Sequence, residues 1–287
     1  MKKHLLFLLI IMFYGCTESN LAFHPRLNPS NGTLELVQTF GGSKNDVAKS
    51  VVSTADGGFA VLGYTQSLDG DITDKATEDY DFWMLKFNSE AQLEWNKTYG
   101  GSGDDRGSSL IETSDGGYAL LGYSDSSDGD VSSNNGNRDF WLVKINASGV
   151  LSWEKSFGYE GVDEGVSIIE TSDNHLMLSG VLDVTASGGE GNQGRFSTKH
   201  AGGDYWSIKI TPTGDIVWSR FYGGSFTDSP TGISETLIGG FINVGGSDSN
   251  DVDISNNKGS YDFWIVKSDV NGDIVWEKSF GGSEIDE

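Results

Sequence analysis

The tryptophans of this chain recur with a regularity that few folds allow. Eight of them form four pairs, each with a spacing of 12 residues, and successive pairs start 58, 65 and 58 residues apart: Trp83/Trp95, Trp141/Trp153, Trp206/Trp218 and Trp264/Trp276. No tryptophan lies outside this scheme. The spacing indicates a tandem repeat, in which a side chain present once per unit is core rather than a ligand contact.

One repeat, taken as residues 99–157, contains four strand-like runs at 108–113, 118–123, 139–145 and 150–157. Tight turns separate the first from the second run and the third from the fourth, whereas a long polar loop, 124–138, precedes the third. Glycine turns between aromatic and β-branched runs are hairpin signals. We therefore expect an all-β fold, a β-propeller with four-stranded blades of about 58 residues. A β-solenoid is the alternative, although its coils are usually shorter.

The repeat count is uneven at the two ends. Four complete repeats are flanked by an isolated fourth strand, Leu34–Phe40, and by the opening of a further repeat, Phe280–Glu287. A propeller closes by pairing strands from its two termini. The count therefore predicts that the chain is truncated.

The N-terminus has the pattern of a secretion signal, residues 1–15, with Lys2 and Lys3 before an apolar run. Phe13-Tyr14-Gly15-Cys16 resembles the lipobox of bacterial lipoproteins, which implies an acylated, palmitate-bearing Cys16. Cleavage elsewhere is the alternative, because Phe13 and Tyr14 are bulky. Residues 16–32 form a polar tether and residues 33–287 the propeller repeats. These segments predict a lipid-anchored protein of the bacterial outer membrane or cell surface.

The repeat motifs also carry a family resemblance. Tyr-Gly-Gly-Ser…Asp, Thr-x-Asp-Gly-Gly, Asp-Gly-Asp, Asp-Phe-Trp-x-x-Lys and Trp-x-Lys, in this order, resemble the tandem repeats of secreted and lipid-anchored bacterial envelope β-propellers. The resemblance covers residues 33–287 and implies a propeller at the cell envelope. It implies no catalytic residues. The third repeat departs most, because Asp173-Asn174-His175 replaces Asp-Gly-Gly.

A lysine recurs on the third strand of every repeat. These residues are predicted to be structural, with stems packed on tryptophan and ammonium groups paired with carboxylates: Lys86, Lys144, Lys209 and Lys267.

The long loops are acidic, and loops on a rigid scaffold are where binding usually occurs. Without Lys2 and Lys3, 17 basic residues remain against 42 acidic ones, a charge that disfavours nucleic acid and anionic membrane surfaces. Three loops carry Asp-x-Asp, a partial calcium-ligand pattern, at Asp69/Asp71, Asp128/Asp130 and Asp251/Asp253. The alternative is that these aspartates form Asx-turns. Calcium is the only cofactor that the sequence indicates.

The third repeat has a longer loop without Asp-x-Asp. It contains a basic and aromatic cluster that is a candidate ligand-binding site: Arg195, Phe196, Lys199 and His200. A tolerated insertion at a loop tip is the alternative interpretation.

Catalysis has little support in the sequence. Only His175 and His200 fall within the repeats, too few for a histidine metal site, and neither lies beside a nucleophile motif. We therefore expect a non-catalytic binding or scaffolding lipoprotein, with a glycan, a peptide or an envelope protein as ligand and membrane contact through the lipid anchor only. The alternative is an extracellular polysaccharide-processing lyase or hydrolase on a propeller scaffold.

Overall fold

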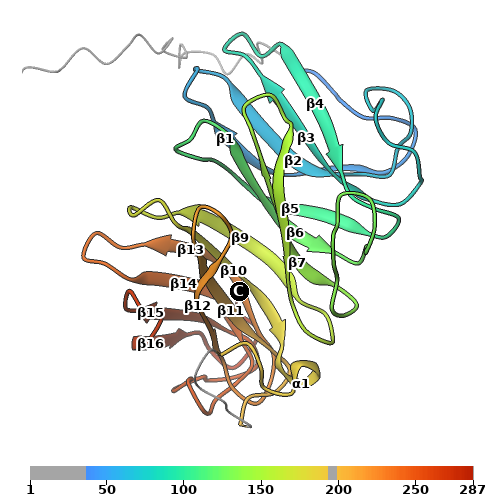
Figure 1. Cartoon of the computed structure of the whole chain (residues 1–287). Coiled ribbons are helices and arrows are strands. Elements are labelled where there is room, and N and C mark those ends of the chain that lie inside the picture. Colours follow the sequence, from blue (N-terminus) through green and yellow to red (C-terminus); the bar gives the residue numbers. More distant parts are fainter. Residues whose placement is uncertain (1–36, 193–198, 287) are drawn as a thin grey trace, which may run out of the picture. The chain divides into compact units, whose positions relative to one another are not determined.

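The computed structural model describes residues 37–192 and 199–286. Residues from Phe40 onward form one unit, which is described by itself. Its described residues hold sixteen strands in four antiparallel sheets of four strands and one short helix (Figure 1). Each sheet corresponds to one tryptophan pair. The prediction of an all-β chain with four complete repeats is confirmed.

Within each sheet the four strands pair in chain order, as successive hairpins. The first strands are β1 (Asp46–Ser53), β5 (Asp105–Glu112), β9 (Glu164–Glu170) and β13 (Asp228–Glu235). The second strands are β2 (Phe59–Thr65), β6 (Tyr118–Ser124), β10 (Leu176–Asp183) and β14 (Phe241–Ser247). The third strands are β3 (Asp81–Phe87), β7 (Asp139–Ile145), β11 (Gly203–Ile210) and β15 (Asp262–Ser268). The fourth strands are β4 (Leu93–Tyr99), β8 (Leu151–Phe157), β12 (Ile216–Tyr222) and β16 (Ile274–Phe280).

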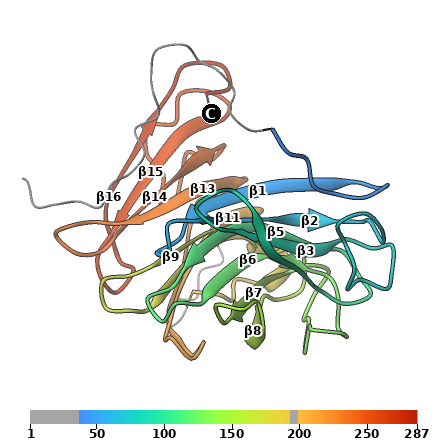
Figure 2. The same ribbon diagram turned by 90° about the horizontal axis from the view of Figure 1, so that it is seen from above.

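Burial follows the position of a strand within its sheet. Every residue of β3 and of β7 is buried, as expected of a central strand covered on both faces. The edge strands β4 and β8 are mostly exposed or half-buried. The first strands of successive sheets contact one another, β1 with β5, β5 with β9 and β9 with β13 (Figure 2).

Successive sheets pack face to face through an aromatic contact. The third-strand aromatic of one sheet meets the third-strand tryptophan of the next, edge-on or tilted, with ring centroids 4.7–4.9 Å apart: Phe82–Trp141, Phe140–Trp206 and Tyr205–Trp264. The tip of each first ring lies against a second-strand glycine. At Gly122, for example, a Cβ would come within 2.8 Å of Phe82 Cζ. The tryptophan repeat is thus a repeat of sheet-to-sheet contacts, and such pairs add to the free energy of burial.

Three of the four recurring lysines pair with carboxylates, as predicted. Lys86 Nζ lies 2.7 Å from Asp56 and 2.9 Å from Glu94. Lys144 pairs with Asp115 and Lys209 with Asp173, both at 2.8 Å. Lys267 differs, because its ammonium donates to the carbonyl oxygens of Gly239 and Ser268.

Two expectations need correction. Val37–Phe40, the described part of the predicted strand Leu34–Phe40, has no strand structure. The third long loop contains a helical turn, α1 (Val184–Ser187), that the sequence did not predict. The Asp183 carboxylate caps it by accepting from Ala186 N, and Gly188 ends it at φ 66°.

Candidate functional site

The long loops and the connections between sheets lie at the same end of the sheets, as predicted. In the first sheet, Asp69 Oδ1 accepts a 2.7 Å hydrogen bond from Ser43 N, and Asp71 Oδ2 accepts one of 2.9 Å from Gly41 N. The Asp-x-Asp loop therefore holds the Gly-Gly-Ser segment that leads into β1.

The same arrangement recurs in two further sheets. Asp128 accepts from Ser102 N at 2.7 Å and Asp130 from Gly100 N at 3.2 Å. In the fourth sheet, Asp251 accepts from Ser225 N at 2.9 Å and Asp253 from Gly223 N at 3.4 Å. These backbone bonds account for the recurrence of the Asp-x-Asp motif.

The candidate calcium ligands are therefore engaged with backbone N–H groups. Within residues 37–192 and 199–286, no group of three or more His, Cys, Asp or Glu side chains could hold a metal ion. A calcium ion takes six to eight oxygen ligands, whereas each Asp-x-Asp loop brings two carboxylates that already accept hydrogen bonds.

A second set of aspartates lies deeper at this end. At each of the three inter-sheet junctions, the first aspartate of a third strand lies near the aspartate at the start of the next sheet's first strand, and a fourth pair of the same kind follows the last sheet. We call these the carboxylate pairs: Asp81/Asp105, Asp139/Asp163, Asp204/Asp228 and Asp262/Asp286. At the first pair a Cβ on Gly100 would lie 2.5 Å from Asp81 Oδ1 and 2.7 Å from Asp105 Oδ2. Only glycine fits between the two carboxylates.

Burial raises the pKa of the aspartates in the three pairs that lie between sheets. Desolvation raises the pKa of Asp81 and of Asp163 to about 7, and that of Asp228 to about 6. The pKa of Asp204 rises to about 10 for the same reason, and the Asp228 charge adds to the shift. Since two like charges in one low-dielectric site oppose each other, each of these three pairs favours holding a proton or a nearby cation.

The first pair has a cation supplied by the chain. Lys75, on the loop between β2 and β3, has a fully buried side chain, and its Nζ lies 2.9 Å from Asp81 and 2.5 Å from Asp79. A cavity of about 290 Å³ opens beside it, between the long loop of the first sheet and the connection into the second. Its polar lining includes Asp74, Lys75, Thr77, Asp81, Thr98, Ser102, Asp128 and Asp130.

A histidine side chain contacts the third carboxylate pair. His200 Nδ1 lies 2.6 Å from Asp204 Oδ2, and Nε2 lies 3.9 Å from Asp253. Burial lowers the pKa of His200, just as it raises that of Asp204, so both groups favour the neutral form at pH 7. A protonated Asp204 carboxyl can then donate to Nδ1. The imidazole ring also packs edge-on against Phe221, with centroids 4.8 Å apart.

The four residues of the predicted ligand-binding cluster have different outcomes. Arg195 and Phe196, like Cys16 at the N-terminus, lie outside the described residues. Lys199 is exposed, whereas His200 is buried and serves the Asp204 carboxyl. His200 therefore contributes to the junction between the third and fourth sheets and not to a solvent-facing cluster.

Neither the carboxylate pairs nor Lys75 was predicted from the sequence. A signal for the pairs was present, because an aspartate stands two residues before each third-strand tryptophan, at Asp81, Asp139, Asp204 and Asp262. No sequence pattern pointed to Lys75, because the other three repeats have no lysine at the equivalent position.

Within the described part of the chain, none of the helical structure is long and apolar enough to cross a membrane. No protein-family model matches the chain, and no curated protein is similar to it. Among solved structures it is similar to a crystal structure of a protein of unknown function from Bacteroides caccae. That likeness has 11% sequence identity and a TM-score of 0.36 and covers 81% of each chain.

Proposed function

We propose that this protein is a non-catalytic binding or scaffolding β-propeller lipoprotein of the bacterial cell envelope, anchored through an acylated Cys16, which takes a hydroxyl-rich ligand such as a glycan. The proposed ligand class rests on the cavity of about 290 Å³ between the first two sheets. It combines hydrogen-bond acceptors, hydroxyl groups and one buried ammonium in a concave site formed mainly by loops, with Asp81 and Thr98 on the adjoining strands.

The cavity is suited to hydroxyl groups because carboxylates accept hydrogen bonds from them. Asp74 lies on its wall and already orders the neighbouring strand, accepting from Thr98 N at 3.2 Å and from Thr98 Oγ1 at 3.0 Å. Ser102 is exposed on the opposite loop. The excess of acidic groups disfavours anionic ligands.

Binding is tested with the full chain by calorimetric titration of neutral oligosaccharides drawn from envelope and extracellular polysaccharides. We expect Asp74→Asn to weaken binding of a responding oligosaccharide at least tenfold. The matched control is Ser133→Ala, at the equivalent place in the second sheet, which should leave the affinity unchanged. Equal effects of the two variants, or no binding by any neutral oligosaccharide, would contradict the proposal.

An enzyme that cleaves polysaccharide is the competing function, and one observation favours it. Asp81 lines the same cavity, and its pKa of about 7 suits a general acid. Prolonged incubation with the bound polysaccharide, followed by chromatography of the products, separates the two. New reducing ends or unsaturated sugars would replace the binding proposal with the enzymatic one.

The anchor is tested separately by incorporation of labelled palmitate in a bacterial host. We expect the label on the wild-type chain and none on Cys16→Ser. Label on both chains would place the acyl group elsewhere.

A further inference from the structure

The aromatic contacts between successive sheets leave one ring of the first sheet and one ring of the fourth sheet unmatched. Three third-strand aromatics are matched with the tryptophan of the next sheet. Within the described residues, Trp83 of the first sheet and Phe263 of the fourth have no such ring contact. The two ends of the series are therefore complementary halves of the same contact.

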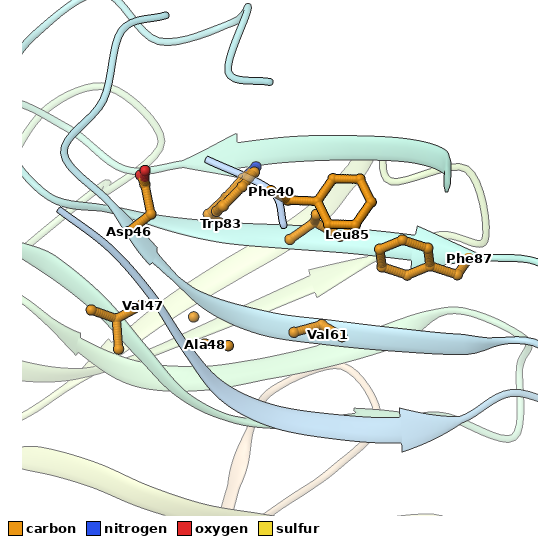
Figure 3. A pocket seen from close by; sticks show the side chains of 9 residues that line it. Phe40, Asp46, Val47, Ala48, Val61, Trp83, Leu85 and Phe87 are labelled. Carbon is orange, nitrogen blue, oxygen red and sulfur yellow. The ribbon is translucent and has the colours of Figure 1, made fainter. Parts of the chain in front are cut away.

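The face of the first sheet that carries Trp83 has a cavity, which we call the socket (Figure 3). We define it by Val61, Gly63, Trp83, Leu85 and Phe87, which line a cavity of about 250 Å³. Phe40 covers the Phe87 end, with ring centroids 5.2 Å apart. The Gly63 end is equivalent to Gly122 and Gly180, where the rings of Phe82 and Phe140 from the preceding sheet are seated. At Gly63 the nearest atoms are backbone of β1 instead.

The fourth sheet presents the opposite half, a donor face made of Phe263, Ile265, Trp276 and Phe280. Trp276 is 41% exposed and Phe280 50% exposed. Their equivalents in the third sheet, Trp218 and Tyr222, are 7% and 2% exposed.

The following sheet accounts for this difference. Trp218 packs against Phe241 with ring centroids 5.9 Å apart, and Tyr222 donates a 2.8 Å hydrogen bond to Gly272 O. Among the described residues, therefore, nothing covers the donor face as the following sheet covers each earlier one.

We propose that the donor face of one chain packs on the socket of a second copy of this chain. Phe263 then lies on Trp83 and Gly63, and Trp276 lies beside Phe59. Continuity supports this contact, because three interfaces within the chain already join these two kinds of face. The contact uses two different surfaces and is heterologous, so it closes as a ring or continues as a head-to-tail series.

We expect the contact between copies to be weaker than the contacts within the chain, because it lacks a hydrogen bond that the internal contacts have. Within the chain, Glu112 and Glu170 accept hydrogen bonds of 2.8 Å from Ala55 N and Ser114 N of the preceding sheet. Ser53 stands at the equivalent place in the first sheet and cannot reach as a glutamate does. The net charge of −23 also opposes association, so added salt should strengthen it.

Sedimentation velocity of the full chain over a concentration series tests the proposal. We expect reversible association that Trp276→Glu and Val61→Glu each weaken at least tenfold, since either places a carboxylate in an apolar contact. Val217→Glu is the matched control, because Val217 is 45% exposed on β12 of the third sheet. Thermal unfolding of each variant checks the fold, and Phe263→Glu replaces Trp276→Glu if the latter unfolds.

Mixing the two variants identifies the contact as heterologous. A 1:1 mixture of Trp276→Glu and Val61→Glu retains one intact donor face and one intact socket on different chains, so it should form dimers that neither variant forms alone. A monomeric wild type, equal loss in Val217→Glu, or no dimer in the mixture would overturn the proposal. Association of all variants alike would also overturn it, by assigning self-association to another segment of the chain.

Discussion

The first and second carboxylate pairs occupy equivalent junctions and are neutralised differently. At Asp81/Asp105 the chain inserts the buried Lys75 ammonium, 2.9 Å from Asp81. At Asp139/Asp163 the described residues supply only backbone donors: Asn135 N donates to Asp139, and Tyr159 N and Asp183 N donate to Asp163. Asp139 Oδ1 is buried with no hydrogen-bond partner among the described residues, as is Asp105 Oδ1 at the first pair. One backbone geometry therefore accommodates a buried carboxylate pair with or without an adjacent ammonium group, and the loop sequence decides which.

The largest effect is expected from removing the cation of the first pair. Lys75→Met leaves the Asp79 and Asp81 carboxylates without their buried partner and should lower the free energy of unfolding by about 3–5 kcal/mol at pH 8. Urea denaturation of the full chain measures it. Lys44→Met is the control, because the Lys44–Glu78 pair is exposed and should contribute less than about 1 kcal/mol. Similar losses in both variants would contradict the comparison.

The second pair should make stability depend on pH. Since the folded pKa of Asp163 is about 7, above its unfolded value of 3.8, its contribution is fully present below pH 4 and is lost as the pH rises to 7. Relative to Asp163→Asn, the wild type should lose about 2–4 kcal/mol of unfolding free energy between pH 4 and pH 8. Denaturation at several pH values measures the difference, and a constant difference would refute the raised pKa of Asp163.

The same substitution should have opposite signs at the two pairs. At pH 8, Asp81→Asn removes one of the two carboxylates that pair with Lys75 and should destabilise by about 1–3 kcal/mol. Asp139→Asn relieves the like-charge repulsion and keeps an acceptor for Asn135 N, so it should stabilise by up to about 1 kcal/mol. Paired melting curves measure both changes. Destabilisation by both variants would mean that the second pair depends on its charge as the first does.

The smallest effect is expected from calcium. Because the Asp-x-Asp carboxylates already accept backbone hydrogen bonds, exchanging calcium for a chelator should shift the melting temperature of the full chain by less than about 1 °C. A shift of several degrees would make these loops metal sites. It would also add a third means of neutralising this end of the molecule.

Several features of the fold follow from local sequence patterns. The tryptophan spacing predicted four repeats of four strands, and the Asp-Gly and Ser-Gly turns located the hairpins because glycine adopts the positive φ seen at Gly57 and Gly116. The pairing of the recurring lysines with carboxylates was correctly predicted for three of the four. The helical turn α1 was missed because its cap, Asp183, lies in the repeat that departs most from the others.

The candidate site was predicted only in part. The end of the sheets that carries the long loops was correctly identified. The Asx-turn alternative for Asp69 and Asp71 was wrong, because both carboxylates accept from distant backbone N–H groups, those of Ser43 and Gly41, and not from their own turn. Whether His200 faces solvent could not be predicted, because its burial depends on Phe221 and Asp204, which come from two other strands.

By itself the sequence determined the repeat, the strand order and the side chains that form each core layer, because these depend on local periodicity and turn chemistry. Only the tertiary structure decided which charges meet. Asp81 and Asp105 are 24 residues apart and come together only when two sheets pack, and the Lys75 ammonium meets Asp81 from the loop between β2 and β3. Whether a buried carboxylate is paired, protonated or exposed depends on distances of a few ångströms, which a repeat pattern does not encode.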